Sequence, residues 1–282
     1  MPGNGRERTL TSRLGLSERR EYVPVSGSTA ERAIALHLTG ERTVPGVPEE
    51  NYWFRRHEVA YHALAPFCRD AVVLEAGCGE GYGAALLAEH ARSVLALDYD
   101  EPTTAHVARR YPELGVVRGN LATLPVATGS VDVVANLQVI EHLWDQSGFL
   151  AECHRVLRPG GRLLVTTPNR LTFTPDSDTP LNPYHTRELS PSELDELLRG
   201  SGFAVEQLLG VHHGPALTEL DRRHGGSIID AQLAVVMGSL PGQAAWPEEL
   251  LSDVAAITAD DFVLHPDDLD ASLDLLAVAV RR

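Results

Sequence analysis

The sequence predicts an α/β protein built on a parallel sheet with helices on both of its faces. Short, continuous apolar runs, which are typical of buried parallel strands, recur from residue 71 onward. Stretches with a helical pattern separate these runs, and a glycine-rich turn follows the first of them. Because strands that alternate with helices form parallel sheets covered on both faces, we expect one large domain of this class.

The elements follow one another in a regular order. The apolar runs predict strands at 71–77, 93–98, 114–119, 130–137, 161–168, 203–211 and 273–282. The helical patterns between them predict helices at 81–91, 101–111, 149–157 and 190–202. Pro102 falls in the first turn of the second of these helices, where a missing N–H group costs nothing.

Composition and pattern divide the chain into segments. A polar, Gly- and Arg-rich start is expected to be disordered, and the rest is expected to form a single domain over residues 28–282. The expected segments are 1–27 (disordered), 28–66 (helical cap), 71–212 (ligand-binding core), 215–259 (helical insertion) and 260–282 (final strand region). We expect the insertion to serve as an acceptor-site lid or as a subunit contact in a homodimer.

Bulk properties exclude several classes of protein. The 282-residue chain is 43% apolar, which is enough for a sizeable core, and has a formal net charge of −15. This charge argues against binding to nucleic acid or to an anionic membrane, since both need basic patches. No apolar run is long enough to cross a membrane, no signal peptide is apparent, and the three cysteines have no metal-type spacing. We therefore expect a cytoplasmic protein.

The glycine-rich turn EAGCGEGYG (75–83) predicts a ligand site, because such a turn brings backbone N–H groups close to a ligand. Gly79-x-Gly81-x-x-Ala84 satisfies the pattern of dinucleotide-binding turns, so a dinucleotide oxidoreductase is an alternative at this point. Glu75 favours another ligand. A pyrophosphate gains little from a nearby carboxylate, whereas a ligand carrying an ammonium group and a sulfonium gains from one.

Two further polar positions extend this site. Asp98 ends the second strand about 20 residues after the turn, where a carboxylate can accept hydrogen bonds from both ribose hydroxyls. Asn120 ends the third strand, where an amide can pair with the edge of an adenine.

At this point the chain resembles a known family. The motifs LEAGCGEGYG, ALDYD, GNLATLP, VDVVANLQVIEHL and RVLRPGGRLLVTTPN, in this order, are similar to those of class I S-adenosylmethionine-dependent methyltransferases. The resemblance covers about residues 70–212. It implies a Rossmann-like seven-stranded sheet of order 3-2-1-4-5-7-6 with strand 7 antiparallel, formed here by LDLLAVAV. It also implies S-adenosyl-L-methionine as cofactor and S-adenosyl-L-homocysteine as product.

The resemblance assigns roles residue by residue. It implies that Glu75 and the turn hold the methionine part of the cofactor, that Asp98 holds the ribose, and that other residues surround the adenine and the sulfonium. The implied set is Glu75, Gly77, Cys78, Gly79 and Gly81 (methionine part), Asp98 (ribose), Asn120 and Leu121 (adenine), Tyr99 (cover of the adenine face), and Asn136, Leu137 and Gln138 (floor near the sulfonium). One departure is Asn120, because the family more often has Asp at this position.

The segment before the first strand, residues 41–61, suggests a cap over the cofactor. Three successive aromatic residues (52–54) cannot all face the core of one helix, so at least one should cover a ligand or another segment. Arg56 is a candidate for a bidentate pair with the cofactor carboxylate, against a solvated helix surface. The segment also resembles the N-terminal stretch of mycofactocin-associated oligosaccharide methyltransferases.

Candidates for the reacting centre lie after strands four and five, in QVIEHLWD and in the long segment 167–189. Transfer to a hydroxyl needs in-line geometry and removal of a proton. In one interpretation His142 or His185 is the base and an acidic neighbour, such as Glu141, orients it. In another, Glu141, His142 and His185 bind a divalent metal, although Gln138 replaces a first glutamate found in metal-using relatives. In a third, they only shape the loop. We favour the base and predict no metal.

The sequence thus predicts a methyltransferase that acts on a hydroxyl of a glycan, for instance mycofactocin oligosaccharide, or of another polar small metabolite. The alternatives are O- or N-methylation in natural-product biosynthesis, and a cofactor-binding scaffold without activity. The expected partner is a small-molecule or oligosaccharide acceptor, and not nucleic acid or membrane.

Overall fold

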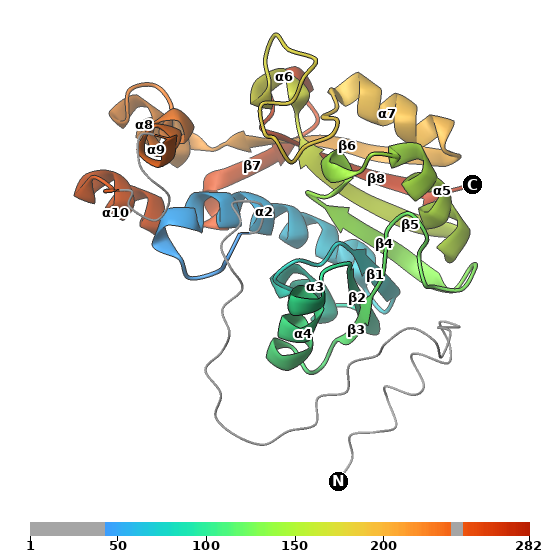
Figure 1. Cartoon of the computed structure of the whole chain (residues 1–282). Coiled ribbons are helices and arrows are strands. Elements are labelled where there is room, and N and C mark those ends of the chain that lie inside the picture. Colours follow the sequence, from blue (N-terminus) through green and yellow to red (C-terminus); the bar gives the residue numbers. More distant parts are fainter. Residues whose placement is uncertain (1–42, 238–244) are drawn as a thin grey trace.

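The computed structural model describes residues 43–237 and 245–282, in which one mixed sheet forms the centre of the molecule (Figure 1). Its strand order is β3-β2-β1-β4-β5-β8-β6-β7. The strands are β1 (Val72–Ala76), β2 (Ser93–Asp98), β3 (Gly115–Arg118), β4 (Val131–Leu137), β5 (Leu157–Pro168), β6 (Phe203–His213), β7 (Phe262–His265) and β8 (Asp274–Arg281). The five strands β1 to β5 pair in parallel, and β8 lies antiparallel between β5 and β6.

The predicted fold class is confirmed, with one difference at the edge of the sheet. The run predicted as the antiparallel seventh strand is β8, and its place beside β5 matches the predicted order. An eighth strand, β7, pairs antiparallel with the end of β6, from Gly210 opposite His265 to His213 opposite Phe262. Its four residues, FVLH, form too short a run to be recognised as a strand by periodicity.

Helices cover both faces of the sheet, as the alternating pattern predicts (Figure 1). Apolar residues of α5 and α7 pack on one face, and apolar residues of α2, α3 and α4 pack on the other. The helices are α2 (Asn51–Leu64), α3 (Tyr82–Ala88), α4 (Glu101–Arg110), α5 (Gln146–Val156), α6 (Arg170–Phe173), α7 (Pro191–Gly200), α8 (Pro215–Arg223), α9 (Ile228–Met237) and α10 (Glu248–Ala256). Short 3-10 turns are η1 (Pro48–Glu50), η2 (Ala65–Cys68), η3 (Ile140–His142), η4 (Ala259–Asp261) and η5 (Leu269–Ala271).

The helical insertion before β7 packs against the N-terminal helix α2. A third apolar cluster joins the two, with Tyr52 from α2, Leu217 from α8, Ile228 from α9 and Val254 from α10. The Asn51 amide donates hydrogen bonds to the carbonyls of Val254 (2.9 Å) and Ile257 (2.8 Å). The insertion is therefore continuous with the N-terminal cap and does not form a separate unit within the described residues.

A partly buried hydrogen-bond chain strengthens this connection. The Tyr52 hydroxyl lies 2.7 Å from His213 Nε2, and His213 Nδ1 lies 2.7 Å from Asp221 Oδ2. The chain links α2 to the end of β6 and to α8. Phe54 faces the other way, with its ring 5.0 Å from that of Tyr82 at the start of α3. The aromatic run thus contacts two different segments, as its helical spacing predicts.

Some expectations lie outside the described residues. The first part of the expected helical cap, residues 28–42, and the expected disorder of 1–27 fall in a part of the chain that the structure does not describe. In the described ranges, no helix combines the length and apolarity needed to cross a membrane.

Candidate active site

The glycine-rich turn lies between β1 and α3, at the carboxyl edge of the sheet. Gly77, Gly79 and Gly81 have φ values of 93°, 48° and 83°, in the left-handed region that favours glycine. A Cβ atom on Gly77 would lie 2.7 Å from Val139, and one on Gly81 would lie 2.9 Å from Val107. The turn needs glycine both for its backbone angles and for its close packing.

Glu75 lies at the end of β1 beneath this turn and is only 1% exposed. Tyr61 of α2 donates a hydrogen bond of 2.7 Å to Glu75 Oε1. Burial raises the pKa of Glu75 to about 8, and this effect outweighs the lowering by the Tyr61 hydroxyl. The other oxygen, Oε2, makes no hydrogen bond within the described residues.

A second buried acceptor lies on the neighbouring strand. Asn136 is fully buried near the end of β4, and its Nδ2 donates a hydrogen bond of 2.7 Å to the carbonyl of Ala76. Its Oδ1, like Glu75 Oε2, has no hydrogen-bond partner among the described residues. Unpaired buried acceptors are uncommon and call for an explanation. A ligand that places a positively charged N–H donor at this edge would explain both unpaired oxygens.

Asp98 is brought to the turn from the end of β2. Its Oδ2 accepts a hydrogen bond of 3.1 Å from the Gly79 N–H, and its Oδ1 accepts one of 3.0 Å from the Asp100 N–H. Asp98 therefore lies against the glycine-rich turn, and its predicted role in holding the ribose stays a prediction. The side chain is half-buried.

The residues predicted to surround the adenine make contacts that do not by themselves indicate a ligand. Tyr99 is 76% exposed beside Asp98, and Leu121 packs against the main core. Asn120 is exposed, and its Oδ1 accepts a hydrogen bond of 2.9 Å from the Ala122 N–H. This local turn explains an amide at position 120 without any ligand. Adenine recognition by these residues stays a prediction.

The end of β4 contains an unusual backbone conformation. Leu137 is buried, and the next residue, Gln138, has a φ of 55° although it is not glycine. The Gln138 N–H donates a hydrogen bond of 2.9 Å to the Thr166 carbonyl of β5. Such a conformation costs on the order of 1–3 kcal/mol and is found most often at functional sites.

Cys78 is a buried residue of the turn rather than a reactive thiol. Burial raises the pKa of its thiol well above the usual range, and the nearby Glu75 acts in the same direction. The thiolate needed for nucleophilic attack is therefore disfavoured, and Cys78 fills space in the turn.

Glu141, His142 and His185 come together, although the last lies more than 40 residues along the chain. The backbone carbonyl of Glu141 accepts hydrogen bonds from the Thr186 N–H (2.8 Å) and hydroxyl (3.0 Å). These bonds hold the segment after β5 against the segment after β4. The rings of His142 and His185 lie 4.8 Å apart, nearly perpendicular to each other.

The Glu141 carboxylate contacts a residue of β5. Its side chain is buried and accepts a hydrogen bond of 3.1 Å from the Thr167 hydroxyl. Burial raises the pKa of Glu141 to about 7, against the lowering effect of His185. His142 Nδ1 lies 3.1 Å from the carbonyl oxygen of Tyr184.

Glu188, which the sequence analysis missed, contacts His185. Glu188 Oε1 lies 2.7 Å from His185 Nδ1. The spacing of three residues in HTRE was the available signal, but a glutamate three residues from a histidine is too common to be recognised without the fold. Glu141, His142 and His185 also offer one donor atom each within 4.8 Å of one another, so their geometry suits a base or a cation.

Arg56 lies elsewhere than the sequence suggested. It is buried, and its guanidinium forms a bidentate ion pair with Asp274 at the start of β8, with both N–O distances at 2.6 Å. Arg56 Nη2 also donates to the Leu273 carbonyl at 2.8 Å. The guanidinium that was predicted to pair with the cofactor carboxylate is therefore paired with Asp274. Because Arg56 is buried, it does not lie on a solvated helix surface either.

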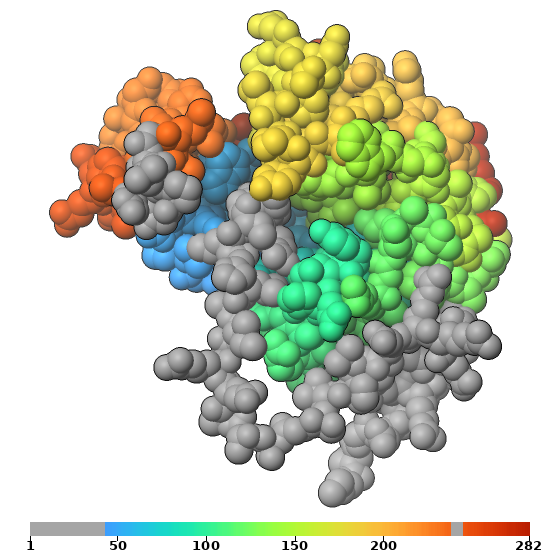
Figure 2. Space-filling model, in the orientation of Figure 1, coloured from blue at the N-terminus to red at the C-terminus, as the bar shows by residue number. Residues whose placement is uncertain are grey.

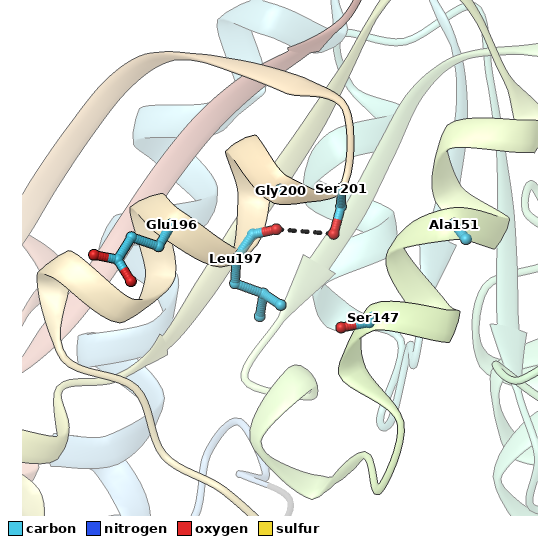
Figure 3. A pocket seen from close by; sticks show the side chains of 6 residues that line it. All are labelled: Ser147, Ala151, Glu196, Leu197, Gly200 and Ser201. Carbon is cyan, nitrogen blue, oxygen red and sulfur yellow. Dashed lines mark hydrogen bonds between the residues drawn. The ribbon is translucent and has the colours of Figure 1, made fainter.

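A groove of about 440 Å³ lies away from these residues, between α5 and α7 (Figure 3). It is lined by Ser147 and Ala151 of α5 and by Glu196 and Leu197 of α7, together with Gly200 and Ser201. Neither the glycine-rich turn nor the histidine pair contributes to its lining. We assign no function to this groove.

Comparison with known proteins identifies the family. A methyltransferase domain model matches residues 74–165. A protein of Mycolicibacterium smegmatis, described as a probable S-adenosylmethionine-dependent methyltransferase, is 62% identical over 250 residues, which are 88% of this chain and 96% of that protein. The chain belongs to the S-adenosylmethionine-dependent methyltransferases.

Further relatives of this methyltransferase agree. A Mycobacterium tuberculosis H37Rv protein of the same description is 57% identical over 262 residues, which are 92% of this chain and 94% of that protein. The solved structure of an S-adenosylmethionine-dependent methyltransferase from Mesorhizobium loti superposes with a TM-score of 0.52 at 19% identity, and covers 84% of this chain and 99% of that one. The predictions of methyl transfer as the activity and of S-adenosylmethionine as cofactor are confirmed, and the dinucleotide reading is wrong.

The residues of this methyltransferase fit that cofactor. Its methionine part carries an ammonium group, which suits the unpaired buried acceptors Glu75 Oε2 and Asn136 Oδ1. Its ribose hydroxyls suit the half-buried carboxylate of Asp98 at the turn.

Proposed function

We propose that the enzyme methylates a hydroxyl group on a glycan or another polar small metabolite, with a histidine as general base. The observation that carries this proposal is the convergence of His142 and His185 after β4 and β5, beside the left-handed Gln138. Two imidazoles at the carboxyl edge of a parallel sheet suit removal of a hydroxyl proton, because histidine is the side chain that most readily takes up and releases a proton near neutral pH.

The cofactor is proposed to lie along the same edge. In this proposal Glu75, Gly77, Cys78, Gly79 and Gly81 surround the methionine part, and Asp98 binds the ribose. Tyr99, Asn120 and Leu121 surround the adenine, and Asn136, Leu137 and Gln138 lie near the sulfonium. The bound cofactor supplies an electrophilic methyl group. The protein residues hold the two substrates in line and accept the proton.

Exposed aromatic side chains beside the histidines support a sugar-like acceptor. Trp144 is 93% exposed and Tyr184 is 60% exposed. The Thr186 hydroxyl bonds to the Leu143 carbonyl at 2.8 Å, so the two segments that carry these rings are adjacent. Large exposed rings at the rim of a site commonly mark a binding surface. A pyranose ring presents an apolar face that stacks on such side chains.

The segments around this edge also give the acceptor site its walls. The segment after β5 (yellow) and the insertion α8–α10 (orange) both project beyond the main body of the molecule (Figure 2). The net charge of −15 makes a polyanion an unsuitable acceptor. The resemblance of the N-terminal segment favours the oligosaccharide of mycofactocin within the glycan class. O- or N-methylation of a natural product is the alternative.

An acceptor screen tests the proposal. Purified enzyme with S-adenosylmethionine would be offered glucose oligosaccharides, simple phenols and amines, and methyl transfer would be followed by mass spectrometry. We expect methyl ethers of the oligosaccharides. Transfer only to amines would contradict the hydroxyl acceptor. Binding of S-adenosylhomocysteine with no transfer to any acceptor would favour a scaffold without activity.

Trp144→Ala tests the stacking surface. We expect the KM for the glycan to rise roughly tenfold, since aromatic contacts contribute on the order of 1–2 kcal/mol, while the affinity for S-adenosylhomocysteine stays unchanged. Trp144→Phe is the matched control, because it keeps an aromatic ring at this position and should leave the KM nearly unchanged. An unchanged KM in Trp144→Ala would argue against this surface.

A further inference from the structure

The segment 182–188 contains a chain of hydrogen bonds that ends on the His185 ring. The Tyr184 N–H donates to Asn182 Oδ1 at 3.0 Å. Asn182 Nδ2 lies 3.1 Å from His185 Nε2, and His185 Nδ1 lies 2.7 Å from Glu188 Oε1. Each link restricts the direction of the next.

This chain determines the tautomer of His185. A backbone N–H can only donate, so the oxygen of the Asn182 amide must face Tyr184 and its NH2 group must face His185. Because that NH2 group has no acceptor lone pair, His185 Nε2 must accept its hydrogen bond. In the neutral ring, the proton therefore lies on Nδ1 and is donated to Glu188. The lone pair needed by a base lies on Nε2.

The surroundings hold the dyad in place. The Glu188 side chain is buried, and so is most of the His185 side chain. The Phe173 ring lies 5.3 Å from the His185 ring at 30°, and the His142 ring contacts it edge-on. A buried carboxylate beside Nδ1–H stabilises the imidazolium that forms when Nε2 takes up a proton.

His142 makes a different contact at its Nδ1. There Nδ1 faces the neutral carbonyl oxygen of Tyr184. A carbonyl dipole favours the protonated ring less than a full negative charge at shorter distance. The Glu188 contact at His185 Nδ1 therefore favours a protonated ring more than the Tyr184 carbonyl contact at His142 Nδ1 does.

We propose that Glu188 is the positioning residue of the reaction and that it selects His185 as the base. This inference rests on the proposed transfer to a hydroxyl. The acceptor hydroxyl replaces the Asn182 amide at His185 Nε2. Its oxygen then bonds to the methyl carbon while the carbon–sulfur bond breaks, with that electron pair staying on sulfur. The hydroxyl proton moves to Nε2, and the resulting positive charge is balanced by Glu188.

Glu188→Gln tests the charge, because glutamine can still accept a hydrogen bond from Nδ1–H but has no charge. We expect kcat to fall about tenfold or more, as part of the roughly 100- to 10,000-fold that a general base contributes. The acid limb of the pH–rate profile should move to lower pH by about one unit or more, because a neighbouring carboxylate raises a histidine pKa by this order. The KM for S-adenosylmethionine should stay unchanged.

Glu196→Gln is the matched control, since Glu196 is exposed on α7 and the same charge is removed there. It should leave kcat and the pH profile unchanged. An unchanged acid limb in Glu188→Gln would overturn the positioning role. Loss of wild-type activity on chelation, with recovery on adding a divalent metal ion, would also overturn it, because the histidines would then be ligands.

NMR of nitrogen-15 histidine separates this inference from the proposed acceptor class, since it needs no acceptor. Wild-type His185 should show protonated Nδ1 and a higher pKa than in Glu188→Gln. A proton on Nε2 would overturn the inference. The expected NMR result without transfer to any hydroxyl would contradict the proposed function but leave the Glu188–His185 pair standing. If Glu188→Gln fails to fold, Glu188→Asp, which keeps the charge at a longer distance, should retain the raised histidine pKa.

Discussion

At the scale of single residues, the site combines buried carboxyl groups with a left-handed backbone position. The pKa of Glu75 is raised to about 8 and that of Glu141 to about 7, in both cases mainly by burial. Gln138, at the end of β4, has a φ of 55°. Shifted acids and strained backbone gather at functional sites because surrounding structure must hold both in place. Their position at one edge of the sheet agrees with the proposed pocket.

The raised pKa of Glu75 predicts pH-dependent cofactor binding. The group is largely protonated at pH 7 in the free enzyme, and a bound ammonium group would favour its ionised form. We therefore expect affinity for S-adenosylhomocysteine to increase as the pH rises toward about 8, with release of a proton at pH 7. Calorimetry in buffers of different ionisation enthalpy measures this release.

The Glu75→Gln variant should bind without releasing that proton. Equal proton release in the variant and the wild type would show that another group titrates. The stability of the free enzyme changes with pH in the opposite direction to its affinity for the ligand. A carboxyl group whose pKa is raised in the folded state stabilises the fold less as the pH rises from 4.5 to about 8.

Asp98 is expected to act through hydrogen bonds to the ribose. Asp98→Ala should weaken binding of S-adenosylhomocysteine by about 1–3 kcal/mol, which is roughly a five- to 150-fold rise in Kd. The carboxylate also accepts from the Gly79 N–H, so part of this loss would come from a less ordered turn. Asp98→Asn, which keeps one acceptor oxygen, should lose less. Unchanged calorimetric affinity in Asp98→Ala would remove it from the proposed site.

At the scale of elements, the helix α2 is held over the sheet by polar contacts as well as by apolar packing. Arg56 pairs with Asp274 of β8, and Asn51 and Tyr52 bind the insertion and the end of β6. Tyr61 of the same helix reaches Glu75 beneath the glycine-rich turn. One helix therefore connects the insertion, the sheet and the cofactor turn. Arg56 holds this helix to β8 through its pair with Asp274.

The buried Arg56–Asp274 pair predicts a large loss of stability when one partner is removed. Asp274→Ala should lower the free energy of unfolding by roughly 3–5 kcal/mol, because it leaves a buried guanidinium unpaired. Asp195→Ala, which breaks the exposed pair with Arg199, should cost about 1 kcal/mol or less. Denaturant unfolding of both variants gives the comparison. Similar losses would mean that the buried pair contributes little.

The sequence predicted those parts of this arrangement that depend on local pattern. Apolar runs such as VVLEA identify buried strands, and glycines at 77, 79 and 81 identify a turn with left-handed angles. Pairs of residues far apart in the chain were not predictable in the same way. Arg56 and Asp274 are separated by 218 positions, and neither residue type reveals its partner before the sheet order is known.

Glu188 was missed for a related reason. Its proposed role depends on the burial of a segment that looked like an irregular loop. Contacts between distant residues, such as the bonds of Thr186 to the Glu141 and Leu143 carbonyls, place that segment against the one that follows β4. The cluster of Glu141, His142 and His185 was predictable, because both segments follow adjacent strands at one edge. Which carboxylate faces which histidine depends on side-chain packing, and only the three-dimensional structure reveals it.

At the scale of the whole molecule, the cofactor should stabilise the fold through the many elements that meet at its proposed site. Ligand at 100 times its Kd adds about 2.7 kcal/mol to the stability of the folded state. For a chain of this size that corresponds to an increase in Tm of about 5 °C or more. We expect this increase with S-adenosylhomocysteine and none with NAD+, measured by differential scanning calorimetry at a fixed pH.

Variants then divide the molecule into a cofactor part and an acceptor part. Asp98→Ala should lose most of the Tm increase at the same ligand concentration, whereas Glu188→Gln and Trp144→Ala should keep all of it, because Glu188 and Trp144 lie on the acceptor side of the proposed site. If Glu188→Gln lost the increase together with its activity, the buried dyad would be coupled to cofactor binding. The proposed division into a cofactor part and an acceptor part would then be wrong.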